Sequence, residues 1–291
     1  MEATEAFDNQ LLGSGVRLIG QRMEGVESAA VGVLIGAGAR DEDESVYGIS
    51  HFVDQMLFRG TETLDSRDIS DRFDALGVSY NSSAGLEMTL LSAVMVNNRL
   101  PPALDLLTDV VRNPSFPVDA VDMVRTLILQ ERRQREDQPG QMVMEEARQK
   151  FFAGSPLSHD VLGSEKTLQA ITRQNIADYW SSYYTANNIV ISIAGNFDWP
   201  SVVDQFERLT SGWVEGRGRE VVREPQPKPG ISVIEREMAQ ENIGFAFPGV
   251  SVNDPHYYAA ALLAQALGGG TTSRLFQEVR EKRGLAYAVQ A

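Results

Sequence analysis

The sequence predicts an α+β protein built from two similar modules, each a mixed or antiparallel sheet with helices packed on it. Three observations support this prediction. Strand-like and helix-like segments alternate through the first part of the chain. A segment rich in Pro, Gly and charge, EGRGREVVREPQPKPG (215–230), then interrupts the alternation. After this candidate linker, the chain begins again with a pattern similar to its opening.

Composition sets limits on the class of protein. The chain has 291 residues, of which 43% are hydrophobic, enough for a substantial core. No run reaches the roughly 18 apolar residues of a membrane span, and the first residues lack a signal-peptide pattern, so we expect a cytoplasmic protein without a membrane partner. A net charge of −14 argues against nucleic acid as a partner. There is no cysteine, so a bound metal would need His, Asp or Glu ligands.

The individual elements follow from apolar spacing and from their end signals. AAVGVLIGAGARDEDES (29–45) is an apolar, β-rich run that ends in Gly and acidic residues, which predicts a buried strand and a loop. Residues 47–58 carry apolar side chains at helical spacing, and 64–77 has a plausible N-cap and a final glycine. The same signals predict further helices at 98–113, 118–137 and 168–184, and strands at 78–95 and 188–198.

An internal repeat explains the restart after the linker. QMLFRGT (55–61) aligns with QALGGGT (265–271) at four of seven positions. This match indicates a repeated module of roughly 210 residues. We therefore expect a complete N-terminal module over 1–214, the linker over 215–230, and the first part of a second, incomplete module over 231–291.

Three polar residues interrupt the apolar helix at 47–58. His51, Asp54 and Gln55 stand at positions i, i+3 and i+4, so they share one helix face. They could be the polar side of a half-buried helix or a satisfied His–Asp hydrogen bond. The repeat argues against this interpretation, because Ala261 and Ala264 replace His51 and Asp54 in the second module. Packing alone therefore does not require these polar groups.

Glu131 is the second unusual polar residue. It continues the apolar stripe of Val121, Val124 and Ile128 on the helix predicted at 118–137. A carboxylate directed at a core needs a cation, a metal or hydrogen-bond donors. Two interpretations stay open at this point: a metal site shared with His51, or an ion pair with one of the arginines Arg125, Arg132, Arg133 and Arg135.

Together, these segments resemble the pitrilysin/insulinase metallopeptidases, or inverzincins, and most of all their bacterial branch similar to mitochondrial processing peptidase. The resemblance rests on GISHFVDQMLFRGT (48–61), TLILQERRQREDQPG (126–140), the run 151–198 and GGGTTSRLFQEVREKRGLAYAV (268–289). It implies the α+β fold of the LuxS and processing-peptidase type. It also implies zinc held by the two histidines of H-x-x-E-H and a distal glutamate, with the motif glutamate as general base.

When the family's motif is compared with this sequence residue by residue, the differences lie at the zinc-site positions. His51 matches the first zinc ligand, and Glu131 matches the distal ligand by its interval from Gln55. Gln55, however, occupies the second histidine position, and an amide oxygen is a poor zinc ligand. Asp54 occupies the general-base position with a shorter side chain, and such a misplacement is costly in proton transfer. Val124 stands where many members carry an acid. We expect zinc to be lost or weakly bound, unless Asp54 becomes a ligand beside His51 and Glu131.

Features for peptide binding remain in the sequence. SYNSSAGLEMTLL (79–91) resembles the family's peptide-binding edge strand, so Asn81, Ser82, Ser83 and Ala84 are candidate backbone contacts. Arg280 and Tyr287 occupy the family's substrate-contacting positions; otherwise they would be a solvated helix residue and a packed strand residue.

We therefore expect a catalytically degenerate, peptide-binding subunit that partners an active homologue as a heterodimer, or that forms a homodimer. The alternatives are an active metalloendopeptidase with an altered ligand set and a non-catalytic assembly scaffold.

Overall fold

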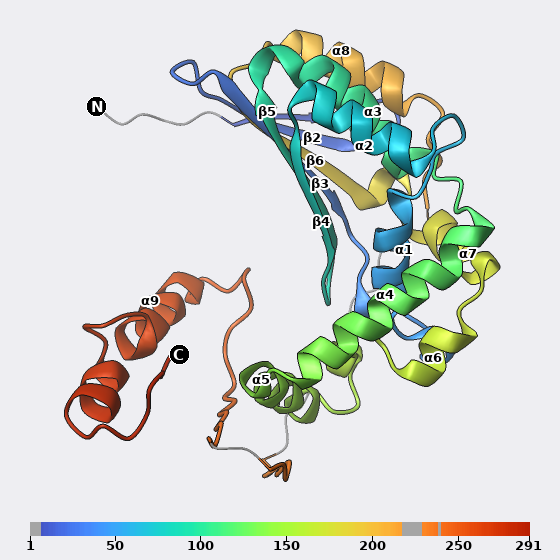
Figure 1. Cartoon of the computed structure of the whole chain (residues 1–291). Coiled ribbons are helices and arrows are strands. Elements are labelled where there is room, and N and C mark those ends of the chain that lie inside the picture. The colour runs from blue at the N-terminus through green and yellow to red at the C-terminus, as the bar shows by residue number, and fades with distance from the viewer. Residues whose placement is uncertain (1–6, 217–228, 238–239) are drawn as a thin grey trace. The chain divides into compact units, whose positions relative to one another are not determined.

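A six-stranded mixed sheet organises the first part of the chain, in the order β1-β2-β6-β3-β5-β4 (Figure 1). The structure is a computed structural model that describes residues 7–216, 229–237 and 240–291. The chain divides into two units, residues 1–244 and 245–291, which we treat separately. The strands are β1 (Asp8–Leu11), β2 (Arg17–Arg22), β3 (Ser28–Ile35), β4 (Ser79–Ala84), β5 (Thr89–Val96) and β6 (Ile189–Gly195).

The central strand β3 shows why this sheet has one face in the core. Its side chains alternate, so that Ala29, Val31, Val33 and Ile35 are buried on one face. Both neighbouring strands, β5 and β6, pair with it in antiparallel orientation. The outer strand β4 pairs with β5 and forms one edge of the sheet, next to helix α1.

Helices cover the buried face of the sheet (Figure 1). In α1, Phe52 and Met56 are fully buried, and α1 packs against α4, α7 and β4. Burying side chains of this size stabilises the fold by roughly 1.5–3 kcal/mol each. The helices of this unit are α1 (Ile49–Leu57), α2 (Ser66–Leu76), α3 (Leu100–Arg112), α4 (Val118–Glu136), α5 (Pro139–Phe151), α6 (Glu165–Ala170), α7 (Arg173–Tyr183) and α8 (Trp199–Thr210). Short 3-10 segments lie at Ala39–Asp41, Glu44–Val46, Asn97–Arg99, Pro156–Ser158 and Ala186–Asn188.

The predicted α+β class is confirmed, and two predicted elements are divided in the structure. The strand expected at 78–95 is the hairpin of β4 and β5, which turns at Gly85. The helix expected at 168–184 is interrupted, because Thr172 accepts a hydrogen bond from Asn175 N and caps a new helix, α7. The linker predicted at 215–230 lies almost entirely outside the described residues.

The second unit contains helix α9 (Tyr257–Gly268) and a π-helical turn (Phe276–Glu281). Gln265 of the predicted repeat lies in α9. The strand expected between the linker and this helix does not form in the described parts of 229–256, which are irregular. A strand is stable only beside another strand, and no described strand pairs with these residues. Among the described residues, no helix has both the length and the hydropathy needed to cross a bilayer.

Candidate functional site

Helix α1 carries the candidate site, and a buried carboxylate fixes where it begins. Gly48 precedes the helix with a φ of 96°, a conformation that favours glycine. Glu42 accepts hydrogen bonds from the backbone N–H groups of Gly48 (2.7 Å) and Ser50 (2.8 Å). These contacts satisfy donors that a helix start leaves free. Burial raises the pKa of Glu42 to about 8, although its hydrogen bonds act in the opposite direction.

His51 and Glu131 meet across helices α1 and α4. His51 Nε2 lies 2.8 Å from Glu131 Oε2. His51 is buried, whereas the Glu131 side chain is 49% exposed. The hydrogen bond with His51 lowers the pKa of the Glu131 carboxyl. The apolar stripe predicted that Glu131 is directed into the core. In the structure it is not. It lies where α4 reaches the surface beside α1.

The arginines near Glu131 have other partners. Arg132 and Arg135 bind the Asp160 carboxylate, with Arg132 Nη1 at 3.1 Å and Arg135 Nη1 at 2.8 Å. Arg125 donates to the backbone carbonyls of Leu168 and Ile171. One interpretation of Glu131 is an ion pair with a nearby arginine. Among the described residues, Glu131 forms no such ion pair with Arg125, Arg132, Arg133 or Arg135. The direct partner of Glu131 is His51.

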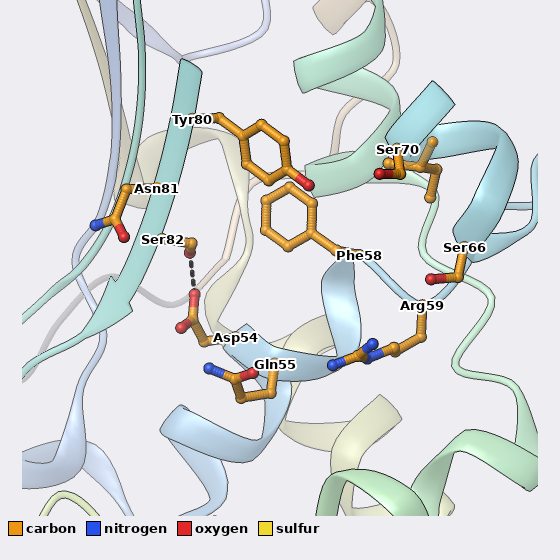
Figure 2. Close-up of a pocket in the computed structure, with 10 residues that line it drawn as sticks. Asp54, Gln55, Phe58, Arg59, Ser66, Ser70, Tyr80, Asn81 and Ser82 are labelled. Atoms are coloured by element: carbon orange, nitrogen blue, oxygen red, sulfur yellow. Dashed lines mark hydrogen bonds between the residues drawn. The ribbon is translucent and has the colours of Figure 1, made fainter. Parts of the chain in front are cut away.

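Asp54, on the same helix, is hydrogen-bonded to strand β4. It is 1% exposed, and its Oδ1 accepts a hydrogen bond from Ser82 Oγ (Figure 2). The nearby backbone N–H of Ala84 also acts to lower the pKa of this carboxyl. Its Oδ2 is buried and has no hydrogen-bond partner among the described residues. Burial raises the pKa of Asp54, and the Ser82 hydroxyl acts against that shift.

The donors in this region do not match a tight zinc site. Zinc sites in proteins use at least three strong donors from His, Cys, Asp or Glu. Here His51 and Glu131 provide two, and Gln55 presents an amide in the position after Asp54. Among the described residues, no group of three or more His, Cys, Asp or Glu side chains is placed to hold a metal ion.

Strand β4 has an open edge whose orientation can be deduced. Gly85 N donates to Met88 O at the hairpin turn, so the odd-numbered residues of β4 pair with β5. The backbone groups of Tyr80, Ser82 and Ala84 consequently face away from β5. Since the Ala84 N–H lies near the Asp54 carboxyl, the backbone groups of Tyr80 and Ser82 are the ones best placed for an added strand.

A cavity of about 350 Å³ lies between this edge and helices α1 and α2. The aromatic rings of Phe58 and Tyr80 stack in its wall with centroids 5.0 Å apart (Figure 2). Arg59 follows α1 and also lines the cavity. The full lining is Asp54, Gln55, Phe58, Arg59, Ser66, Ile69, Ser70, Tyr80, Asn81 and Ser82. Of the predicted edge-strand residues, Asn81 and Ser82 therefore line it, while Ser83 and Ala84 do not.

Arg280 and Tyr287 contact each other within the second unit. The Arg280 guanidinium lies 5.1 Å from the centre of the Tyr287 ring and 4.7 Å from that of Phe276. Tyr287 is 83% exposed and lies outside any strand. The interpretation of Tyr287 as a packed strand residue is therefore wrong. The substrate-contacting roles of both residues stay predictions.

Comparison with known families decides the identity of the fold. Residues 18–165 match the model of the insulinase family, peptidase family M16, and residues 170–291 match the model described as the peptidase M16 inactive domain. The chain belongs to the insulinase family of peptidases. This result confirms the resemblance to pitrilysin and insulinase.

Relatives in this family are similar over nearly the whole chain. A protein of Rickettsia felis named "Uncharacterized zinc protease" is 32% identical over 286 residues, which are 98% of this chain and 69% of the relative. A zinc protease of the same description from Mycobacterium tuberculosis is 34% identical and covers 96% of this chain and 65% of its own length. The chain thus spans about two thirds of these relatives.

Solved structures agree on the fold. A peptidase M16 inactive domain from Pseudomonas fluorescens superposes with a TM-score of 0.88 at 24% identity, covering 98% of this chain and 70% of that one. A protease from Helicobacter pylori gives 0.84 at 19% identity, with coverage of 98% and 71%. At these identities the similarity concerns the fold alone.

Proposed function

We propose that this insulinase-family chain belongs to a catalytically degenerate subunit that binds peptides and partners an active homologue. One observation carries the proposal: the helix that bears the family's zinc motif has Gln55 at the second ligand position, while Asp54, at the general-base position, is bonded to strand β4. An amide in place of the histidine and a shorter, already bonded carboxylate in place of the glutamate support the loss of ordinary zinc peptidase chemistry.

Weak zinc binding follows from the donors. Relatives are named zinc proteases, so zinc is the metal to test. The pair His51 and Glu131 would hold it through two strong donors, and the neutral amide of Gln55 adds little. Changing a residue that only hydrogen-bonds to a metal ligand already costs roughly 10–100-fold in metal affinity. Replacing a ligand should cost more.

Peptide binding does not need the metal. An extended peptide can add to β4 through the outward backbone groups of Tyr80 and Ser82. Arg280 and Tyr287, which lie in the second unit, would bind a substrate carbonyl, including one held in the active site of the partner. Their cation–π contact keeps the guanidinium beside the ring in the second unit.

N-methylated peptides test this mode of binding directly. A strand-forming peptide is labelled with a fluorophore, and its affinity for the purified chain is measured by anisotropy. A series of peptides is prepared, each methylated at one backbone nitrogen. Methylation should weaken binding at alternate residues only, because alternate N–H groups of an added strand face β4. Equal effects at neighbouring residues, or no binding of any peptide, would contradict strand addition and favour an assembly scaffold.

A partner assay tests the second part of the proposal. The chain is mixed with a homologue that carries an intact H-x-x-E-H, and the mass of the complex and the cleavage of a reporter peptide are measured. We expect a heterodimer that cleaves faster than the homologue alone. Self-association into a homodimer without any effect on the homologue would contradict the partnership. Cleavage by the chain alone that Glu131→Gln abolishes would instead support an active enzyme with altered ligands. We keep the cytoplasm as the expected location.

A further inference from the structure

Among the described residues, Arg59 is the one cationic side chain that lines the cavity between β4, α1 and α2. It is half-buried, and its Nε is buried without a hydrogen-bond partner among the described residues. A guanidinium carries five donors and always bears a charge. Figure 2 shows its side chain extending from the end of α1 toward Gln55. A buried donor left without an acceptor is costly, so this group fits a ligand that brings one.

The other polar groups of the cavity are mostly able to donate. The Ser66 and Ser70 hydroxyls and the Gln55 amide line it. Asp54 is the only acid in the described lining; its Oδ1 is bonded to Ser82, and its Oδ2, which has no hydrogen-bond partner among the described residues, is buried and not exposed to the cavity. The missing partner is therefore an anionic acceptor at Arg59 rather than a second cation.

The open edge of β4 determines which peptide side chains reach this cavity. Tyr80 and Ser82 expose their backbone groups along the edge, and both side chains point to the helix side of the sheet, whereas the side chain of Asn81 points to the other face (Figure 2). Residues directly opposite in paired strands place their side chains on the same face. A peptide residue opposite Tyr80 or Ser82 consequently projects its side chain toward Phe58 and Arg59.

We propose that this cavity is a subsite for an acidic side chain, Asp or Glu, of a peptide added to strand β4, with Arg59 as the residue that selects it. The proposal rests on the peptide binding described above, and it adds the chemistry of the ligand. The carboxylate would pair with the Arg59 fork, and its aliphatic stem would pack on the stacked rings of Phe58 and Tyr80. The cavity would thus select an acidic side chain although the chain as a whole has a charge of −14.

A peptide series tests the subsite. A labelled strand-forming peptide is prepared with Gln, Glu or Lys at each position in turn, and binding to the 291-residue chain is measured by anisotropy. We expect Glu to bind roughly tenfold more tightly than Gln at one position or at two alternate positions. Lys should bind more weakly than Gln there. Arg59→Gln should remove the preference for Glu, and Arg59→Lys should retain only part of it, because a lysine lacks the bidentate fork.

Arg67→Gln is the matched control. Arg67 lies on α2 beside Ser66, but its side chain is 88% exposed and it pairs with Asp71 outside the cavity lining. The preference for Glu should persist in this variant. Equal affinity for Glu and Gln at every position, a preference for Lys, or a Glu preference that survives Arg59→Gln would overturn the subsite while leaving peptide binding intact. If no peptide of the series binds, both the subsite and the proposed function fail.

Discussion

His51 Nε2 lies 2.8 Å from Glu131 Oε2, and this contact joins helix α1 to helix α4. We predict from the resemblance that these residues stand at the first and the distal zinc-ligand positions of the insulinase family. The fold brings His51 and Glu131 together, and the residue that we predict at the remaining ligand position, Gln55, carries an amide. On the proposed function, the chain keeps this contact between the two helices without the full set of zinc donors.

Restoring the two missing residues should restore metal binding. The double variant Gln55→His with Asp54→Glu completes H-x-x-E-H on α1 and leaves Glu131 in place. We expect zinc affinity to rise by more than 100-fold over the unchanged chain, because a third strong donor closes the ligand set. Isothermal titration with zinc at neutral pH measures the change.

Asp54→Glu alone is the control for that experiment, since it supplies no second histidine. Its zinc affinity should stay close to that of the unchanged chain. A double variant that folds but binds zinc no better would show that the site has changed beyond these two residues.

The hydrogen bond from Ser82 to Asp54 should contribute to stability. Ser82→Ala leaves a buried carboxylate oxygen without its donor, which we expect to reduce the free energy of unfolding by about 1–3 kcal/mol. The pKa of Asp54, already raised by burial, should rise further. Urea unfolding measures the first effect.

Ser83→Ala makes the same chemical change on the neighbouring residue, which is exposed and outside the cavity lining. It should change the free energy of unfolding by less than about 0.5 kcal/mol. Equal losses in Ser82→Ala and Ser83→Ala would argue against a specific role for the Asp54 contact.

Glu42 should make stability fall as pH rises. Its pKa is raised from 4.5 to about 8, so between these values the folded chain holds a proton that the unfolded chain has released. The contribution of Glu42 is therefore complete below pH 4.5 and decreases as pH rises toward 8. The slope is at most about 1.4 kcal/mol per pH unit.

Glu42→Gln removes this titration, so the difference in free energy of unfolding between the unchanged chain and the variant isolates it. From pH 5 to 8, we expect the unchanged chain to lose stability relative to Glu42→Gln. Chemical unfolding at several pH values measures the difference. A difference that is constant with pH would contradict the assignment of a raised pKa to Glu42.

The Glu131 carboxyl should titrate below its usual range because of His51. Its pKa is lowered mainly by the hydrogen bond with His51, and His51→Gln removes the imidazole. We expect the pKa of Glu131 to move up toward 4.5 in this variant, as read by NMR of the side-chain carboxyl. Gln149→Ala, a change on α5, should leave it where it is. An unchanged Glu131 pKa in His51→Gln would contradict the contact.

The sequence predicted the elements whose apolar spacing is regular. Helix α1 and strand β6 lie within the predicted ranges, and Glu131, which the interval from Gln55 selected as a ligand candidate, contacts His51. Short elements were harder to predict. β1 and β2 were not predicted, and β4 and β5 were predicted as one strand, because residues 85–88 carry a weak turn signal between apolar residues.

The contacts of the site depend on residues distant in the sequence, which spacing does not reveal. Glu42 is one of several acids in RDEDES, and only the fold shows which one caps α1. Asp54 binds Ser82 because β4 lies beside α1, a relation that no local pattern carries. Only a weak signal in the sequence indicated that Arg59 lines a site: it is a cation between an apolar helix and a glycine.

Zinc content tests the degenerate site most directly, because His51, Gln55 and Glu131 all lie in the first unit. The purified 291-residue chain is saturated with zinc, dialysed at neutral pH, and measured by elemental analysis, with peptide cleavage assayed in parallel. A degenerate site predicts far less than one zinc per chain and no cleavage that a chelator can abolish. One zinc per chain, together with cleavage that is lost on chelation and absent in Glu131→Gln, would contradict it.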